Sequence, residues 1–276
     1  MRRFFGVWGA FFQQQVKSLL EYKMDFAIGM VAIAFQQIGS FLILFAVFTR
    51  ITAIGGFSFD EMLLFFGYSQ LLRGIDHVYN DNIWTVGWWR IRDGSFNLFL
   101  IRPMGVLTHA VMERVQFDGL GEVLLGTLIF AYAFVRLGLG WGPVDWVLFA
   151  LFLVFGLAIY FAIKLLCASV AFWTVTSGEL MTVAYEINGF TKYPLDIYKN
   201  AVLRWALTYV LPFAVVAYFP MVHFLRGDGY AAQILGWGPG FDGLVLTFTG
   251  LIAGISLALA YGVWRLGLRR YNSTGT

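Results

Sequence analysis

The chain of 276 residues contains 59% hydrophobic and 19% aromatic residues but only 13% charged ones. A soluble domain has roughly 45–50% apolar and about 25% charged residues, so this composition argues against a soluble enzyme, a nucleic-acid-binding protein and a disordered scaffold. The net charge of +3 provides no surplus for binding a polyanion. The single cysteine, Cys167, excludes an internal disulfide. The composition therefore indicates an all-α integral membrane protein.

The first predicted element is a helix over residues 2–22 that lies flat in the cytoplasmic membrane interface. Aromatic and aliphatic residues recur at helical spacing from Phe4 to Leu19, while polar residues such as Gln13 and Lys17 lie mostly off that stripe. The alternative is a simple N-terminal extension of the first membrane span. The polar residues also argue against a cleavable signal sequence.

The sequence predicts six membrane spans, because a bilayer core about 30 Å thick needs roughly 20 apolar helical residues. They cover residues 26–48, 59–80, 119–138, 144–173, 203–224 and 243–264. The second span is the least apolar, since Arg73, Asp76 and His77 follow its short hydrophobic part. It is predicted because the orientation of the other spans requires a crossing there.

The basic residues predict an orientation with both termini inside. With six spans, 14 of the 19 basic residues fall on the inner side and three on the outer side, which is a strong positive-inside bias. The inner set is Arg2, Arg3, Lys17, Lys23, Arg90, Arg92, Arg102, Arg114, Lys192, Lys199, Arg204, Arg265, Arg269 and Arg270. We read one membrane domain over residues 1–276, with long loops on the cytoplasmic side.

No pattern in the sequence predicts catalysis, a cofactor site or a metal site. None of the lysines follows a glycine, so a Gly-Lys-Ser/Thr phosphate loop is impossible and any ATP must bind to another chain. The histidines His77, His109 and His223 lie far apart, with no cysteine or carboxylate at ligand spacing. We interpret them as packing or interface residues.

The most informative segment is the cytoplasmic stretch over residues 88–104, which we call the coupling segment. Asp93-Gly94 is a turn signal, Ser95 can cap a helix, and Pro103 disfavours helix at the residue before it. These residues predict an apolar helix of about two turns flanked by basic residues. Such a helix needs something to pack against, so we expect it to dock a cytoplasmic partner. The alternative is a helix that folds back onto the lipid headgroups.

Three motifs resemble permease subunits of the type-2 ATP-binding-cassette exporter superfamily, closest to a bacterial branch that pairs two related permeases with one type of ATPase. They are Trp89-x-Ile91-x-x-Gly94-x-Phe96-x-x-x-Leu100-x-Arg102-Pro103, the stretch Phe190-x-x-Tyr193-Pro194-x-x-Ile197-Tyr198 continued by Leu203-Arg204, Leu207-Thr208 and Pro212-Phe213, and the tail Gly267-x-x-Arg270-Tyr271-x-Ser273-x-Gly275. The similarity covers essentially the whole chain. One departure follows Pro220, where an apolar run ending in Leu-Leu-Gly is expected and His223-Phe224-Leu225-Arg226-Gly227 stands instead.

The resemblance implies six spans, an interfacial N-terminal helix and a coupling helix after the second span. It also implies a pair of permeases, a heterodimer more readily than a homodimer, in the bacterial cytoplasmic membrane. Separate ATPase subunits would bind ATP and Mg²⁺. The residues it assigns to ATPase coupling are Arg90, Arg92, Asp93, Gly94, Phe96, Leu100, Arg102 and Pro103, and residues 179–199 are a possible second contact.

In the resembled fold the second and fifth spans face the central pathway. The candidates for the pathway or the subunit interface are therefore Arg73, Asp76, His77, Thr208 and Pro212. Arg73 and Asp76 are three residues apart and are expected to neutralise each other on one helix face, or to form a structural ion pair with a neighbouring helix. A rival function is a self-contained channel or ion-coupled secondary transporter that uses Arg73, Asp76 and Lys164.

Other polar and small residues in the spans have structural interpretations. Lys164 is expected to snorkel to the cytoplasmic interface. Arg114, Asp118 and Glu122, spaced by four, are expected to form an intrahelical charge ladder, and Pro212 to kink the fifth span. In the last span, the glycines and alanine at positions 250, 254, 258 and 262 are expected to pack within the subunit more readily than between subunits. The outer loop over residues 227–242 is expected to dip back into the interface, although an ordinary surface loop is also compatible with its sequence.

Overall fold

The computed structural model describes residues 23–102, 104–237 and 243–272, together with Gly9, Gln13, Lys17 and Glu21. In this part of the chain the secondary structure is helical, apart from one isolated bridge between Ile54 and Phe57. The predicted interfacial helix over residues 2–22 lies outside the described residues except at those four positions.

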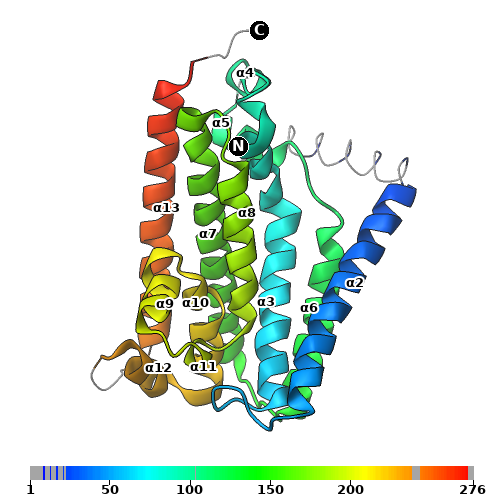
Figure 1. Ribbon diagram of the computed structural model, residues 1–276, viewed down its shortest axis with the longest axis vertical. Helices are drawn as coiled ribbons and strands as arrows, with labels where there is room; N and C mark the ends of the chain where they lie inside the picture. Colours follow the sequence, from blue (N-terminus) through cyan, green and yellow to red (C-terminus); the bar gives the residue numbers. More distant parts are fainter. Residues whose placement is uncertain are drawn as a thin grey trace.

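Among the described residues, four helices are long and apolar enough to cross a membrane by length and composition. They are α2 (Lys23–Phe48), α6 (Gly119–Arg136), α7 (Pro143–Thr174) and α13 (Leu244–Arg270). Each coincides with a predicted span. A fifth long helix, α3 (Phe59–Asn80), begins and ends at the predicted residues, and its apolar run is interrupted by Arg73 and Asp76. It stands between α6 and α7 in the bundle (Figure 1).

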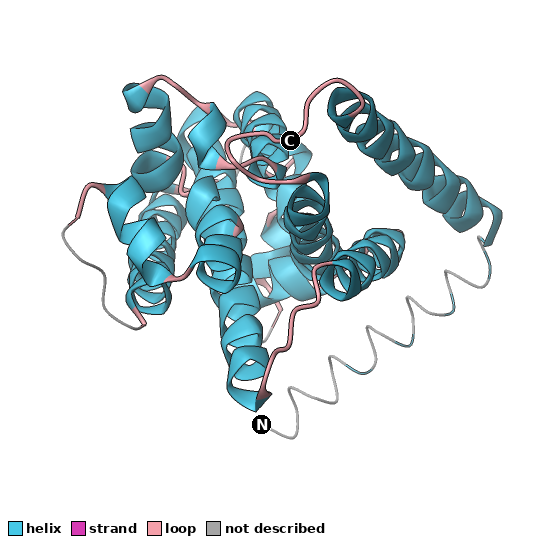
Figure 2. Ribbon diagram, turned by 90° about the horizontal axis from the view of Figure 1, so that it is seen from below, coloured by secondary structure: helices cyan, strands magenta, loops and turns pink. Residues whose placement is uncertain are grey.

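The two ends of the bundle contain different short elements. One end holds α4 (Asn97–Leu100) and α5 (Val106–Met112), and we call it the inner end (Figure 1). The opposite, outer end holds the loop between α2 and α3 together with α12 (Asp228–Leu235). Figure 2 shows the bundle from the outer end, with α2 at its edge. Most side chains of α2 are exposed, which suits a helix that faces lipid.

Glycines set the spacing between α3 and α6. A Cβ built on Gly67 would lie 2.5 Å from the backbone nitrogen of Phe130, and one on Gly74 would lie 2.5 Å from that of Val123. A Cβ on Gly126 would likewise collide with the backbone of Leu71. Only hydrogen side chains therefore allow these two helices to approach so closely.

The small residues of α13 are used differently from the prediction. Gly250 faces the Phe155 ring, with 3.3 Å between that ring and a built Cβ, whereas Gly254 and Gly262 have nothing within 4 Å. Instead, Gly267 packs closely against Phe172, since a Cβ built on Gly267 would collide with the Phe172 ring. Packing within the subunit therefore uses only one end of the predicted stripe, because the α7–α13 contact follows a different face of the helix.

The predicted fifth span over residues 203–224 is not one helix. It consists of α9 (Ala201–Trp205), the π-helical η5 (Ala206–Val210), α10 (Phe213–Val216) and α11 (Tyr218–Arg226). The break expected at Pro212 is confirmed, since proline lacks the N–H that would continue the helix. The chain turns back from the inner end earlier, at α8 (Gly178–Asn188), which runs beside α7 and α3 (Figure 1).

This path changes the assignment of three basic residues to the inner side. A Cβ built on Gly55, in the outer α2–α3 loop, would lie 3.1 Å from Cβ of Asp196, so residues 189–200 reach the outer half of the bundle. Lys192 Nζ lies 3.4 Å from Ser40 Oγ of α2. Lys192, Lys199 and Arg204 are therefore not neighbours of the coupling segment. Without these three residues, the excess of basic residues on the inner side is smaller than predicted.

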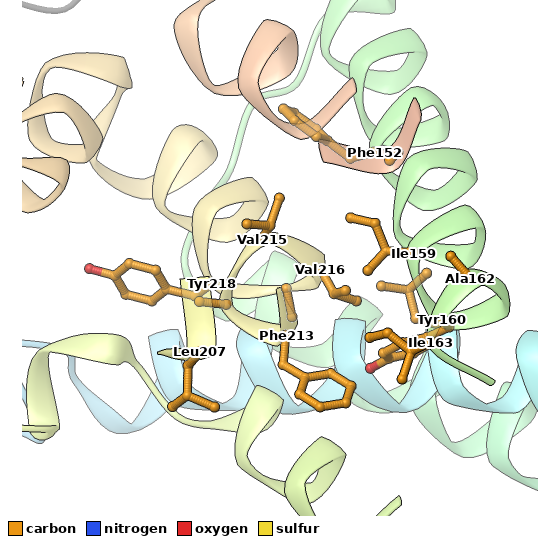
Figure 3. Close-up of a cluster of buried hydrophobic side chains, with 14 of the residues drawn as sticks. Phe152, Ile159, Tyr160, Ala162, Ile163, Leu207, Phe213, Val215, Val216 and Tyr218 are labelled. Atoms are coloured by element: carbon orange, nitrogen blue, oxygen red, sulfur yellow. The ribbon is translucent and has the colours of Figure 1, made fainter. Parts of the chain in front are cut away.

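The core lies between α7 and the broken segment that follows α8. Val215 and Val216 of α10 are fully buried and face Ile159 of α7 (Figure 3). At the outer end, His223 Nδ1 lies 2.5 Å from Asp228 Oδ1 and joins α11 to α12. The dip of the outer loop stays a prediction, because residues 238–242 lie outside the described part of the chain.

Candidate functional site

The coupling segment folds as a set of short turns at the inner end. After η1 (Asp81–Ile83), the π-helical η2 (Val86–Arg90) leads into a turn in which Gly94 has φ of 75°, a conformation that favours glycine. The backbone N–H of Ser95 donates to Asp93 Oδ1 at 2.9 Å. The predicted Asp93-Gly94 turn is thus confirmed.

The helix after this turn is shorter than predicted. It is α4, a single turn that follows Phe96, and Ser95 makes no capping hydrogen bond to it. Phe96 is fully buried, with ring centroids 4.9 Å from Tyr271, 5.2 Å from Phe172 and 6.1 Å from Trp264. Phe96 therefore fastens the coupling segment to α7 and α13, and it does not form part of an exposed surface.

Two arginines of the coupling segment point toward α5. Arg90 Nη2 lies 2.5 Å from Glu113 Oε2, and its guanidinium carbon lies 5.0 Å from the centroid of Phe99. Arg102 Nη1 lies 2.9 Å from Nε2 of the buried His109. These contacts hold the residues on either side of α4 against α5. Pro103 lies outside the described residues.

The electrostatics of the coupling segment follow from these contacts. Slight burial raises the pKa of Asp93, but hydrogen bonds from Ser95 and the nearby Arg90 and Arg92 outweigh it and hold that pKa below its ordinary value. Burial, followed by the charge of Arg102, lowers the pKa of His109. The inner end is therefore built around an ionised Asp93 and a neutral His109.

The coupling segment has an exposed apolar face. Leu98 is 46% exposed, Leu100 is 47% exposed and Ile101 is 77% exposed, and the side chains of Arg92 and Arg102 are exposed beside them. Large apolar side chains that protrude next to arginines are typical of a surface that another protein or a membrane covers.

The coupling segment is also attached to the start of α8. The carbonyl oxygen of Gly87 accepts hydrogen bonds from Ser177 N at 2.8 Å and from Thr176 Oγ1 at 3.2 Å. A Cβ on Gly87 would collide with Met181, and one on Gly178 would lie 2.5 Å from the ring of Trp88. These close and largely buried contacts pack η2 directly against the N-terminus of α8.

A cluster of charged side chains lies in the inner half of the bundle. Lys164 of α7 forms ion pairs with both Asp76 of α3 and Asp81 of η1. It therefore does not snorkel to the interface, because two carboxylates from α3 and η1 reach it within the bundle. Of the two alternatives for Arg73 and Asp76, the pair between them does not form, whereas the ion pairs with neighbouring helices do. Arg73 Nε instead lies 3.6 Å from Glu122 Oε2, since α6 brings that carboxylate closer.

His77 lies at the centre of the same cluster. Its ring nitrogens are 3.4 Å from Asp81, 3.8 Å from Asp118 and 3.8 Å from Glu122. The predicted intrahelical ladder does not form, because α6 begins only at residue 119 and Arg114 is exposed in the preceding loop. Asp118 and Glu122 instead lie beside His77 of α3.

The charged cluster borders a cleft with about 340 Å³ of empty space between α3, α7, α8 and α10. Its polar and aromatic lining includes Asp76, Lys164, Trp84, Tyr160, Tyr185 and Phe213. Figure 3 shows Tyr160 and Ile163 of α7 close to Phe213 of α10. We call this space the α7–α8 cleft.

The remaining pathway candidates lie in the broken segment. Thr208 is buried, and its hydroxyl donates to the carbonyl oxygen of Arg204 at 2.8 Å, so it is occupied within its own turn. Pro212 ends η5 and places the next residue, Phe213, in the wall of the α7–α8 cleft. Asp76 and Phe213, the residue after Pro212, thus line the same cleft, whereas Thr208 is not among its lining residues.

Sequence reasoning missed three members of this site. Asp81, Trp84 and Tyr185 were not singled out, although Asp81 follows His77 at helical spacing. Trp84 and Tyr185 are about a hundred positions apart in the chain, and only the fold brings their rings to 5.7 Å. Within the described residues, no group of three or more His, Cys, Asp or Glu side chains has an arrangement that could hold a metal ion.

Comparison with protein families gives one match. A family described as "ABC-2 family transporter protein" matches residues 34–275. Comparisons with curated proteins and with solved structures give no significant match. The matched region includes α2 from residue 34 onward, all the other long helices described above, the coupling segment and the α7–α8 cleft. The chain therefore belongs to the ABC-2 family of transporter proteins and is a membrane transport component.

Proposed function

We propose that this chain is the transmembrane permease subunit of an ATP-driven exporter in the bacterial cytoplasmic membrane. It forms the substrate pathway with a second, related permease, and separate ATPase subunits bind ATP and Mg²⁺. Membership of the ABC-2 family supports the transport role. The absence of a Gly-Lys-Ser/Thr loop in the sequence supports an ATPase on another chain.

The path of the chain supports six crossings with both termini inside. In addition to the four long apolar helices, α3 extends from the outer end to the inner end. The segment from α8 to α11 returns from the inner end to the outer end in several pieces (Figure 1). Broken helices of this kind are tolerated in membranes where protein surrounds them, as α7 and α13 do here.

The observation that carries the proposal is the attachment of the coupling segment to α8. Gly87 binds Ser177 through its carbonyl oxygen, and α8 supplies Tyr185 and Met181 to the wall of the α7–α8 cleft. A partner that pushes on the coupling segment therefore displaces one wall of the cleft. This is the mechanical connection that a transporter driven by a separate ATPase requires.

The exposed face of the coupling segment is the expected docking surface. Leu98, Leu100 and Ile101 provide the apolar centre, while Arg92 and Arg102 provide a basic rim. Protein interfaces typically combine an apolar centre with a polar rim. Phe96 and Gly94 act indirectly, because they hold α4 in position.

The test is association with the ATPase encoded beside this gene. Substitution Ile101→Ser removes the most exposed apolar side chain of the docking surface, and we expect about tenfold weaker co-purification, corresponding to roughly 1.4 kcal/mol. Val135→Ser is a matched control, because Val135 is 76% exposed at the outer end of α6. Unchanged association and an unchanged ATPase rate in the Ile101 variant would contradict the docking role.

The rival function is a self-contained channel or an ion-coupled transporter. It is not favoured, because the family match points to an ABC-2 transporter. Reconstituted vesicles separate the two functions. Transport by this chain without any ATPase, driven by an ion gradient, would overturn our proposal.

A further inference from the structure

The charges beside the α7–α8 cleft do not balance. One ammonium group, that of Lys164, pairs with two carboxylates, those of Asp76 and Asp81. Asn80 Nδ2 also donates to Asp76 Oδ1, at 2.9 Å, but it adds no charge. The group that borders the cleft therefore keeps one negative charge when all three side chains are ionised.

The neighbouring charges do not supply the missing cation. Arg73 lies next to Glu122, and His77 is shared by Asp81, Asp118 and Glu122. In the described part of the chain, no other Lys, Arg or His has a nitrogen within 4.0 Å of these four carboxylates. Two permanently charged basic groups thus face four carboxylates, and protonation of His77 would still leave an excess of negative charge. Excess charge inside a membrane domain is costly unless a cation or a proton neutralises it.

The walls of the cleft are aromatic. The rings of Trp84 and Tyr185 meet edge to face at 5.7 Å, and those of Tyr160 and Phe213 lie 6.3 Å apart. Aromatic faces attract cations and also bind flat apolar groups. The guanidinium carbon of Arg73 lies 4.5 Å from the centroid of the Tyr185 ring, so one of these rings already contacts a cation.

One polar group on a residue that lines the cleft lacks a hydrogen-bond partner. Trp84 Nε1 is buried and makes no hydrogen bond, whereas buried donors in proteins nearly always have an acceptor. A ligand with an acceptor atom would satisfy it. An anionic ligand is disfavoured, because the ammonium of Lys164 already has two carboxylate partners.

We propose that the α7–α8 cleft is the substrate site and that it binds an organic cation with a flat aromatic body and a hydrogen-bond acceptor. The cationic group lies beside Asp76, the aromatic body lies against Trp84 and Phe213, and the acceptor faces Trp84 Nε1. This inference names the substrate class of the proposed exporter and rests on that proposed function for the direction of transport.

Cys167 provides a reporter for the test, because it lines the cleft and is the only cysteine of the chain. The purified full chain is treated with a trimethylammonium or a sulfonate methanethiosulfonate reagent of similar size. Each rate is divided by the rate of the same reagent with a small free thiol, because the two reagents differ in intrinsic reactivity. A negatively charged cleft concentrates cations, so on this scale we expect the cationic reagent to modify Cys167 at least about tenfold faster. Equal rates, or faster reaction of the anionic reagent, would overturn the proposal. A Cys167 that reacts with neither reagent would overturn it too, because the cleft would then be closed to ligands.

Ligand protection of Cys167 is the second measurement. 1-Methylnicotinamide, a small planar cation with an amide acceptor, should protect the thiol, and nicotinate, which has the same ring but a negative charge, should not. We expect Asp76→Asn and Trp84→Leu each to raise the half-protecting concentration about tenfold or more. Trp84→Leu leaves every charge in place, so it remains informative if the Asp76 variant folds poorly. Asp60→Asn, at the exposed outer pair with Arg136, is the control.

Neither measurement involves an ATPase, so this inference and the proposed function can fail separately. Equal protection by both compounds, or protection by neither, removes the cleft as a cation site even if the ATPase docks normally. Selective protection by 1-methylnicotinamide without any ATPase association would retain the cleft as a cation site and contradict the proposed exporter.

Discussion

At the scale of single residues, charged side chains in this bundle are placed where another helix can pair with them. Lys164 has Asp76 and Asp81, and Arg73 has Glu122. Same-helix ion pairs were expected for Glu122 and for Arg73 with Asp76, and in the structure the ion-pair partners come from other helices instead. An unpaired charge inside a membrane costs several kcal/mol, so these pairs constrain how α3, α6 and α7 assemble.

We predict that Lys164→Met destabilises the protein by about 3–5 kcal/mol, because it leaves two carboxylates without their counter-ion. Unfolding in detergent, followed by circular dichroism, measures the effect. Arg136→Met is the matched control. Arg136 pairs with Asp60 at 3.5 Å, but its side chain is 58% exposed, so its loss should cost less than about 1 kcal/mol. Similar losses in the two variants would contradict the structural role of Lys164.

His109 predicts a pH dependence of stability at the inner end. Burial and Arg102 hold its pKa below the ordinary value of 6.5, so the unfolded chain takes up a proton more readily than the folded one. The stabilising contribution is complete above that ordinary value and is lost as the pH falls through the lower pKa of the folded state.

The measurement compares unfolding temperatures of wild type and His109→Gln at about pH 7.5 and about pH 5.5. Acidification should lower the unfolding temperature more in the wild type, because Gln can still accept from Arg102 but cannot take up a proton. Identical slopes in the two proteins would show that His109 does not contribute.

At the scale of helices, the closest contacts depend on glycine. The α3–α6 pair uses Gly67, Gly74 and Gly126, where any Cβ would meet the backbone of the facing helix. The GxxxG pattern that stands out in the sequence of α13 is mostly exposed, with nothing within 4 Å of Gly254. A small-residue pattern therefore shows where close approach is possible, while the neighbouring helix decides where it occurs.

We predict that Gly126→Ala destabilises the bundle by about 1–3 kcal/mol, because the added methyl group must push α3 away. Gly254→Ala should be neutral or stabilising by up to about 1 kcal/mol, because alanine favours helix and the site is open. Both unfolding free energies are measured in the same detergent. Equal destabilisation by both substitutions would contradict the observed α3–α6 contact.

At the scale of the whole molecule, the broken segment after α7 decides which residues reach which end. The chain leaves the inner end at Gly178, and Asp196 already lies against the α2–α3 loop. Lys199 therefore lies in the outer half, although its charge alone suggested the opposite side. The coupling segment stays at the inner end, attached to α8, α7 and α13.

Cysteine labelling in cells tests this arrangement in a Cys167→Ser background. We expect Lys199→Cys and Thr52→Cys to react with a membrane-impermeant maleimide from the same side, and Arg92→Cys only from the other side. All three residues are exposed in the structure. Labelling of Lys199→Cys together with Arg92→Cys would contradict the path of residues 178–226 described here.

The sequence by itself determined the class of the protein, four of its long apolar helices, the bounds of α3 and the turn at Asp93-Gly94. These features depend on local properties, namely apolar length, capping and turn chemistry, which a single segment contains in full. The same holds for the break at Pro212, since proline lacks the N–H donor that an uninterrupted helix needs at that position.

Only the tertiary structure decided which charges pair, which glycines are packed and which residues form the α7–α8 cleft. Asp81 and Lys164, like Trp84 and Tyr185, are distant in the chain, and no local pattern relates them. The irregular path after α8 escaped the hydropathy pattern because its short helices are packed among other helices of the bundle, so no single apolar run of membrane length is needed. Pairing and cleft geometry are properties of the assembled bundle.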